Sequence, residues 1–281
     1  MSLGAILDAI GRRPDELTPL PGGVANQAYL LGADLVLRVP RSEAFAADLR
    51  KEAAVLPIVR AAGVRTADLV EYAEQPAPYL MTTRLPGAED TGSRAVARQV
   101  GRELAKLHRI PQAPPEVPQD DPADPHALLD DLASAGWIGA ADAMWLGEWF
   151  TRLEADIAPA PRRALIHGDV APQNLLSTPD GHLSGLIDWG DAAVADPAVD
   201  FAKLPFALVP AALQGYREAD GWEPRILWHR LCWALGRLKD PEPRTAARHW
   251  SAPPASRLLD LLHFFATDPP PPWPSHAPPK W

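Results

Sequence analysis

The segment His167-Gly-Asp-Val-Ala-Pro-Gln-Asn174, followed by Ile187-Asp-Trp-Gly190, is the part of the sequence that decides how the chain folds. Between these motifs, Thr178-Pro-Asp-Gly181 has the composition of a tight turn, and a short apolar run lies on each side of it. The two runs are therefore predicted to pair as an antiparallel hairpin. This pairing would bring Asn174 and Asp188 together at the open end of the hairpin.

A loop that contains Gly168 and Pro172 precedes the hairpin and can bring Asp169 to the same place. Carboxylate and carboxamide oxygens suit Mg²⁺, which usually takes only one or two ligands from the protein. Asn174 and Asp188 are thus the candidate metal ligands. Asp169 is the candidate carboxylate that orients an acceptor hydroxyl and accepts its proton during phosphoryl transfer. Any one of these residues alone would more often be explained by a side chain that hydrogen-bonds to the backbone of a turn. Together, at this spacing, the three residues favour catalysis.

The motifs His167-Gly-Asp-x-x-x-x-Asn174 and Ile187-Asp-Trp-Gly190 closely resemble those of the aminoglycoside phosphotransferase family, which are small-molecule relatives of the protein kinases. The resemblance implies an α+β, protein-kinase-like fold with two lobes. A small N-terminal antiparallel sheet with one helix would form the first lobe, and a larger, mostly helical lobe would follow. The resemblance also implies Asp169 as the catalytic residue, Asn174 and Asp188 as ligands of Mg²⁺, and ATP as the co-substrate.

The segment Ala195-Asp-Pro-Ala-Val-Asp-Phe-Ala202 is similar to the usual continuation of these motifs in the family. By this resemblance, Asp196 and Asp200 are expected to be mainly structural. His167 is expected to brace the catalytic loop rather than to transfer protons.

The N-terminal third contains a further similarity. Pro21-Gly-Gly-Val-Ala-Asn-Gln27 resembles the short loop with which the family covers its nucleotide. Gly22 and Gly23 would allow the backbone to approach phosphate closely, and Asn26 is a further candidate for nucleotide binding.

Arg38 stands where the family usually has the lysine or arginine that contacts phosphate, and Glu52 matches the ion-pair partner of that residue. Arginine keeps the charge, but its larger, forked head does not simply replace lysine, and a surface ion pair is the alternative interpretation.

The segment Tyr79-Leu-Met-Thr-Thr-Arg84 resembles the hinge strand, whose backbone would bind adenine around Thr82 and Thr83.

Apolar spacing predicts mainly strands before the turn Pro86-Gly87 and mainly helices after it. The expected strands cover 28–31, 35–39, 67–73 and 78–84, and the expected helices cover 44–62, 93–108, 126–135 and 140–156, with a helical stripe at 227–238. Pro57 should kink or end the first helix, and the proline-rich segment 109–125 should be a loop.

These elements predict a nucleotide-binding lobe at 1–85 and a catalytic and acceptor-binding helical lobe at 86–267. A proline-rich tail follows at 268–281. Its composition favours polyproline II, so it is expected to supply no helix and to be mobile or to lie on the surface.

The composition, with 47% hydrophobic and 22% charged residues, is typical of a soluble globular protein. No run approaches the ~20 apolar residues that a bilayer span needs, and the N-terminus has no signal-peptide pattern, which predicts a cytoplasmic protein without a membrane partner. The net charge of −9 disfavours nucleic acid as a partner. The single cysteine, Cys232, is expected to be buried and inert.

Only a few residues separate Asp188 from Asp196, which leaves no room for the activation segment that positions a peptide substrate. The hydroxyl acceptor is therefore predicted to be a small molecule such as an aminoglycoside-like antibiotic, a sugar or another metabolite. Leu37-Arg-Val-Pro-Arg41 is also similar to macrolide phosphotransferases. Acidic residues that could bind an amine-bearing acceptor, or simply form a solvated face, are Asp120, Asp121, Asp124, Asp130, Asp131, Glu218 and Asp220.

Two other functions are compatible with the same motifs. A metal-dependent hydrolase would use His167, Asp169 and Asp188 as ligands around an activated water, but it would leave Arg38 and Glu52 without a role. A nucleotide-binding module without turnover would share the fold, although such modules commonly lose one of the acidic positions.

Overall fold

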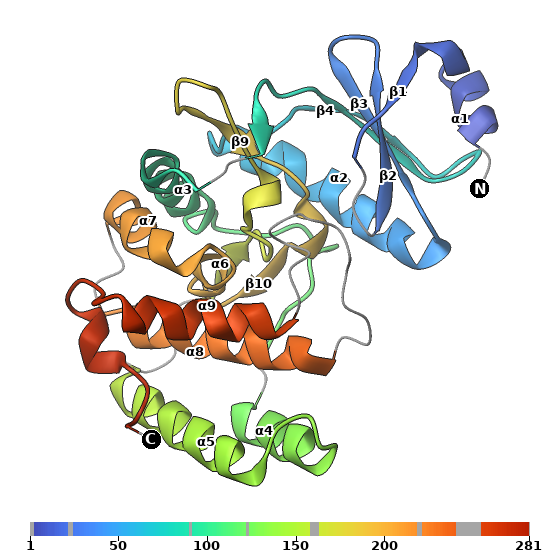
Figure 1. Cartoon of the computed structure of the whole chain (residues 1–281). Helices are drawn as coiled ribbons and strands as arrows, with labels where there is room; N and C mark the ends of the chain where they lie inside the picture. The colour runs from blue at the N-terminus through green and yellow to red at the C-terminus, as the bar shows by residue number, and fades with distance from the viewer. Residues whose placement is uncertain are drawn as a thin grey trace.

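The computed structural model describes residues 3–21, 25–89, 92–121, 124–157, 163–217, 221–239 and 254–280. The strands up to Thr83 gather with the first two α-helices in one lobe, and most of the later helices form a second, larger lobe (Figure 1). This arrangement confirms the predicted α+β fold class. Within the described ranges, no helix is long and apolar enough to cross a membrane.

The N-terminal lobe is built on a five-stranded sheet in which all neighbouring strands are antiparallel. Its order is β1-β2-β3-β5-β4, with β1 (Leu17–Pro19), β2 (Asn26–Leu31), β3 (Leu35–Pro40), β4 (Leu69–Ala73) and β5 (Tyr79–Thr83). Helix α1 (Leu3–Ala9) buries Ile6 and Leu7 in a small cluster with Leu37 and Tyr79 of the sheet. The predicted strands are thus all present, and β3 lies in the middle of the sheet.

Helix α2 (Ala46–Ala61) continues through Pro57, so of the two effects predicted for this proline, a kink or an end of the helix, the second is wrong. A proline inside a helix costs about 3 kcal/mol because it removes one hydrogen bond and crowds the preceding turn. The side chains of Leu49, Val55 and Val59 are fully buried on both sides of Pro57. Since each such side chain contributes about 1.5–3 kcal/mol by burial, packing outweighs the cost of the proline.

The larger lobe consists mainly of helices, as predicted. They are α3 (Arg94–Leu107), α4 (Pro125–Ser134), α5 (Ala140–Asp156), α6 (Val199–Ala202), α7 (Val209–Tyr216), α8 (Glu223–Gly236) and α9 (Pro254–Ala266). Helix α4 begins at Pro125, one residue inside the segment predicted as a loop, because proline is tolerated at the first position of a helix.

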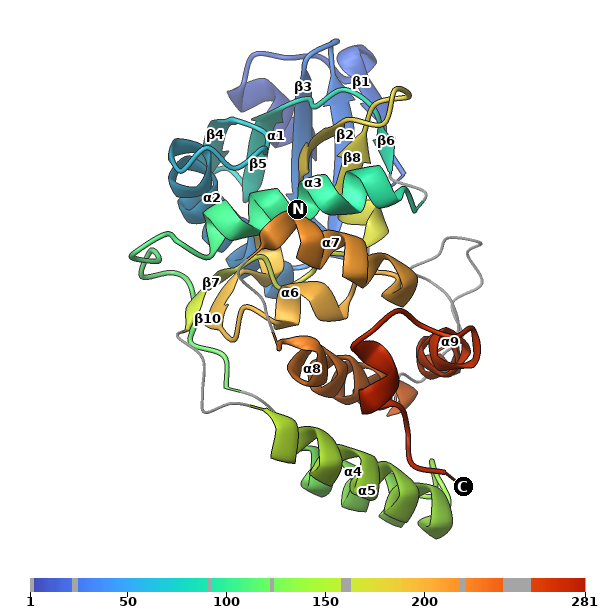
Figure 2. The ribbon, with the colours of Figure 1, turned by 90° about the vertical axis from the view of Figure 1, so that its left-hand side faces the viewer.

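Helices α3 and α7 lie side by side and approach each other unusually closely (Figure 2). A Cβ atom on Gly101 of α3 would lie 1.9 Å from the carbonyl oxygen of Ala212, and one on Gly215 of α7 would lie 1.9 Å from the carbonyl oxygen of Arg98. Glycine at both positions therefore allows the two backbones to touch.

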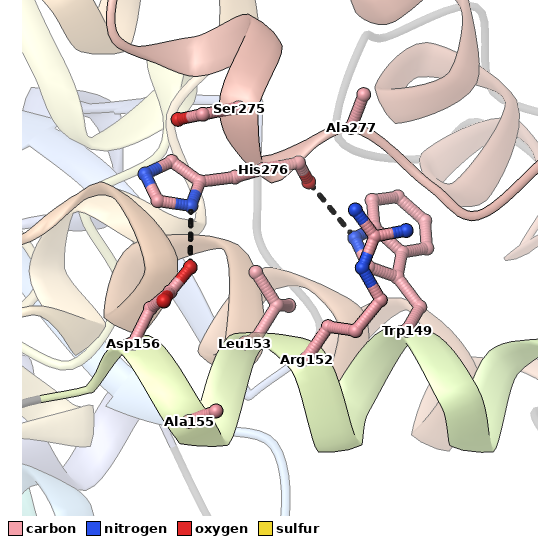
Figure 3. Close-up of a pocket in the computed structure, with 8 residues that line it drawn as sticks. All are labelled: Trp149, Arg152, Leu153, Ala155, Asp156, Ser275, His276 and Ala277. Carbon is pink, nitrogen blue, oxygen red and sulfur yellow. Dashed lines mark hydrogen bonds and ion pairs between the residues drawn. The ribbon is translucent and has the colours of Figure 1, made fainter.

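The proline-rich tail is packed along the surface of the helical lobe. This is one of the two arrangements expected for it, but the expectation that the tail supplies no helix is wrong. Residues Trp273–His276 form a short 3-10 helix, and the side chain of Trp273 is buried. The indole Nε1 of Trp149 donates a hydrogen bond of 2.9 Å to the carbonyl oxygen of His276 (Figure 3). The imidazole of His276 faces Asp156, with Nδ1 and Oδ2 3.3 Å apart. Indole burial and hydrogen bonding thus hold this proline-rich segment against the helices.

The predicted central hairpin is formed by β8 (Leu175–Ser177) and β9 (Leu183–Leu186), which pair antiparallel, with β6 (Ala88–Glu89) beside β8. Just before it, β7 (Ala164–Ile166) pairs with β10 (Ala193–Ala195). Because β7 pairs with β10 and β8 pairs with β9, the loop between β7 and β8 lies beside the segment between β9 and β10. These two segments contain Asp169, Asn174 and Asp188.

Candidate active site

Asp200 of α6 holds the backbone of the catalytic loop. Its carboxylate, which is fully buried, accepts hydrogen bonds from the backbone N–H groups of His167 at 2.9 Å and Gly168 at 2.8 Å. His108 Nε2 lies 3.0 Å from the same carboxylate. Burial alone would raise the pKa of Asp200, but the hydrogen bond and charge of His108 hold it below its usual range. The expected structural role of Asp200 is thus confirmed.

Gly168 is required at its position in this loop. Its φ angle is +79°, and a Cβ atom there would lie 2.2 Å from the carbonyl oxygen of Asp191. Only glycine fits this combination of a left-handed backbone and a close approach to another backbone segment.

His167 braces the loop, as expected. Its ring Nδ1 accepts the backbone N–H of Asp169 at 3.3 Å, so Nε2 carries the proton and donates to the carbonyl oxygen of Ile187 at 3.1 Å. The ring also packs on the indole of Trp189, with ring centroids 4.5 Å apart. Because both nitrogens are engaged, the imidazole connects the catalytic loop to the segment after β9.

The Asp169 carboxylate is held from two sides and is 26% exposed. The amide Nδ2 of Asn174 donates to Asp169 Oδ2 at 2.8 Å and to its backbone oxygen at 2.9 Å. The ammonium of Lys203 lies 3.1 Å from Asp169 Oδ1. Since the amide nitrogen of Asn174 points at Asp169, its carbonyl oxygen is turned away and can serve another ligand.

Asp188 and Glu52 are joined through Arg38, which confirms the predicted ion pair and extends it. Arg38 NH1 lies 2.5 Å from Glu52 Oε2, and NH2 lies 2.6 Å from Asp188 Oδ1. The guanidinium from β3 thus bridges α2 and the end of the hairpin. Asp188 adopts the left-handed region, with φ 67° and ψ 72°, a strained backbone that is typical of functional positions.

Burial and the charge of Arg38 act in opposite directions on the pKa values of Glu52 and Asp188. Burial raises the pKa of Glu52 to about 7, although the Arg38 charge opposes this shift. Burial would also raise the pKa of Asp188, but the Arg38 charge and hydrogen bond hold it below its usual range. Asp188 is therefore ionised at neutral pH and is 46% exposed, so its carboxylate can be reached by a cation.

The described residues predicted to contact nucleotide lie on interior strands of the N-terminal sheet, at the start of β2 and the end of β5. Thr82 is buried in β5, and the backbone N–H of Thr83 donates to the carbonyl oxygen of Asp68 at 2.9 Å. Asn26 begins β2, and its buried Oδ1 has no hydrogen-bond partner among the described residues. Gly22 and Gly23 lie outside the described residues. Nucleotide contacts of these residues stay predictions.

The sequence matches the profile of the phosphotransferase enzyme family over residues 16–234. The chain belongs to this phosphotransferase family. Its resemblance to aminoglycoside phosphotransferases is therefore confirmed at the level of the family.

Relatives of this chain include viomycin phosphotransferase from Streptomyces vinaceus, with 30% identity over 52% of this chain. That match spans 55% of the relative, about half of its length. The fold is similar to an APH(2″) enzyme in complex with GDP and kanamycin, with a TM-score of 0.67, 20% identity and coverage of 94% of this chain and 98% of the other. It is also similar to macrolide 2′-phosphotransferase MphH from Brachybacterium faecium, with a TM-score of 0.62, 25% identity and coverage of 84% and 90%.

Several of the acidic residues proposed for binding an amine-bearing acceptor already have partners in the structure. Asp121 pairs with Arg163 at 2.5 Å, and Asp131 lies 3.4 Å from Lys239. Asp124 caps α4 by accepting the N–H groups of its first turn. These contacts favour the solvated or structural interpretation for those residues, and Glu218 and Asp220 lie outside the described residues.

The oxygen donors of the candidate site fit Mg²⁺. Asp188 provides an ionised carboxylate and Asn174 a carboxamide oxygen, which is the number of protein ligands that Mg²⁺ usually takes beside substrate phosphates and water. Among the described residues there is no cluster of three or more His, Cys, Asp or Glu side chains able to hold a metal ion.

Sequence reasoning missed the roles of Lys203 and His108. Lys203 follows α6 directly, and its only sequence signal is its position three residues after Asp200, which the family motif contains. His108 ends α3, far from either motif, and no pattern in the sequence connects it to Asp200.

Proposed function

We propose that this chain is an ATP-dependent phosphotransferase that transfers the γ-phosphate to a hydroxyl group of a small molecule. The observation that supports this most strongly is the Arg38 bridge. It joins Glu52 in the sheet lobe to Asp188 in the helical lobe, beside the loop that presents Asp169. Membership of the phosphotransferase family and the names of the relatives point to the same reaction.

The residues have complementary roles in this reaction. The acceptor hydroxyl donates its proton to Asp169, its oxygen forms a bond to the γ-phosphorus, and the bond from that phosphorus to the leaving ADP oxygen breaks. Asn174 and Asp188 hold Mg²⁺ through their oxygens. When bound, this ion neutralises charge on the phosphates of the nucleotide. Arg38 orients Asp188 and would contact phosphate. By their resemblance to the family loop, Gly22, Gly23 and Asn26 would contact it as well.

For the acceptor, we propose an antibiotic or a related hydroxylated metabolite. The relatives and structural neighbours are named for viomycin, kanamycin and macrolides, and the neighbours also include a protein described as a choline/ethanolamine kinase family member. We also propose a cytoplasmic location, which is supported by the use of ATP and by the composition. The adenine would lie against β5 near Thr82 and Thr83.

A panel assay tests this function. The purified chain is incubated with Mg²⁺ and either ATP or GTP, together with viomycin, kanamycin, erythromycin or choline, and each product is examined by mass spectrometry for one added phosphoryl group. GTP is included because the APH(2″) neighbour contains GDP. Phosphorylation of at least one panel member is expected. If neither nucleotide is consumed with any acceptor, the proposed function is wrong.

The role of Asp169 is tested with a matched pair of variants. Asp169→Ala should lower kcat by roughly 10²–10⁴-fold, as expected for loss of a positioned acid–base group, and should leave ATP–Mg²⁺ binding nearly unchanged. Asp180→Ala is the control because it removes an exposed carboxylate from the turn of the same hairpin. A hydrolase would act without ATP, and a binding module would bind nucleotide without product, so the same assay separates all three functions.

A further inference from the structure

Lys203 is a partly buried cation whose contacts are not explained by the roles assigned so far. Its ammonium lies 3.1 Å from Asp169 Oδ1 and 3.8 Å from Asp191 Oδ2, and its side chain is 15% exposed. Asp169 is the proposed base and Asp191 lies just beyond the metal-binding Asp188. An ammonium with so little exposure loses much of its hydration, so it is placed here only because carboxylates compensate for that loss.

The position of Lys203 in the fold is fixed from the protein interior. It directly follows α6, in which Phe201 and Ala202 are buried. Asp200 of the same short helix holds the backbone N–H groups at the start of the catalytic loop. One rigid segment therefore contacts the loop twice, through Asp200 at its backbone and through Lys203 at its catalytic side chain.

The two groups that hold Asp169 contact different oxygens. Asn174 donates to Oδ2, and Lys203 contacts Oδ1. Each carboxylate oxygen has two lone pairs, so each keeps one free for the proton of an acceptor hydroxyl. With Asn174 alone, the carboxylate could rotate about its Cβ–Cγ bond. With both contacts, the plane of the Asp169 carboxylate and the direction in which its oxygens point are fixed.

We propose that Lys203 is a positioning residue for Asp169, which locks the carboxylate in the orientation that receives the acceptor proton. This inference rests on the proposed phosphotransferase function. It assigns α6 a second task besides holding the loop backbone. The contact is expected to act on the chemical step and not on nucleotide binding, because Lys203 faces Asp169 and Asp191 rather than the Arg38 bridge.

The kinetic test compares Lys203→Met with wild-type protein, using the panel member that is phosphorylated fastest. The expected result is a fall in kcat by about 10- to 100-fold, the loss that a misplaced catalytic group produces, with an unchanged KM for ATP. Lys203→Arg should recover part of the loss because it keeps the charge. Lys106→Met is the matched control: it removes an ion pair with a buried carboxylate, Glu103, at 2.8 Å, away from the site.

A double-mutant comparison separates positioning from direct contact with substrate. In an Asp169→Asn background, adding Lys203→Met should lower the remaining rate no further, because the residue acts through Asp169. A further fall of similar size would overturn the proposal and place Lys203 in contact with the phosphate or acceptor. An unchanged kcat for Lys203→Met alone, or an equal loss with Lys106→Met, would also overturn it.

A readout independent of turnover keeps this inference distinct from the proposed function. Crystal structures of wild-type and Lys203→Met protein should show the Asp169 carboxylate in one orientation in the first and in a different or divided orientation in the second. If the panel assay shows no activity, the proposed function fails, and this structural comparison still decides the role of Lys203. An identical Asp169 side chain in both structures would refute positioning.

Discussion

The guanidinium of Arg38 lies 2.6 Å from the carboxylate of Asp188, although 150 positions separate them in the chain. Arg38 lies on the central strand β3 of the sheet lobe, and Asp188 follows the hairpin beside the catalytic loop. The same guanidinium contacts Glu52 of α2. One forked side chain thus sets the position of the proposed metal ligand relative to the N-terminal lobe.

Nucleotide binding should need both terminal nitrogens of the Arg38 guanidinium, and not only its charge. Lysine has a single nitrogen, so Arg38→Lys can contact Glu52 or Asp188 but not both in this geometry. Losing one charge-assisted hydrogen bond of about 1.5–3 kcal/mol should weaken ATP–Mg²⁺ binding by about tenfold or more in calorimetry. Arg13→Lys, at an exposed surface pair, is the control. Equal affinity of wild type and Arg38→Lys would show that a point charge is enough.

Asp188→Asn should separate metal-dependent from metal-independent nucleotide binding. Removing an anionic oxygen ligand should weaken ATP binding by at least about tenfold in the presence of Mg²⁺ and should change it little in EDTA. Asp180→Asn, which neutralises a carboxylate at the far end of the same hairpin, should bind as wild type does in both conditions. The assignment fails if the two variants show the same magnesium dependence.

Asp200→Asn should change how stability depends on pH. The pKa of Asp200 in the folded protein lies below its ordinary value, so its contribution is present above pH 3.8 and is lost as pH falls through the folded pKa. At neutral pH, the variant should lose roughly 1.5–3 kcal/mol of unfolding free energy, because amide donors replace an oxygen that accepts backbone N–H groups.

Chemical denaturation at pH 7 and at pH 3 measures this effect. The difference between wild type and Asp200→Asn should be largest at pH 7 and should shrink at pH 3. A difference that is the same at both values would mean that Asp200 has no lowered pKa in the folded state.

Gly101→Ala should destabilise the helical lobe although alanine favours helices. The added Cβ would lie 1.9 Å from a carbonyl oxygen of α7, so the two helices must separate, at a cost of about 1–3 kcal/mol. Gly147→Ala in α5 is the matched control, since the nearest atom to its Cβ would be a Leu129 methyl at 3.8 Å. There, the same change should stabilise by about 0.5–1 kcal/mol. Thermal unfolding of the two variants should show opposite signs.

Local patterns were sufficient for much of this protein. The turn at 178–181 and its apolar flanks predicted the hairpin, and alternating and helical spacing predicted the strands and most helices. These features depend on interactions between residues close in sequence, which composition and spacing report directly. The same spacing placed Asp169, Asn174 and Asp188 near one hairpin end, where Asn174 does contact Asp169.

Features that depend on contacts between residues far apart in the sequence were decided by the tertiary structure. Burial carried α2 through Pro57 and docked Trp273 of a tail whose prolines suggested an exposed segment. Long-range pairing brought His108 to Asp200 and Lys203 to Asp169. Such contacts depend on where helices and loops meet in space. Because burying an unpaired charge is costly, each charged side chain in the interior lies beside a partner. The sequence alone determined which groups are proposed to do the chemistry, and the packing of distant elements determined how those groups are held.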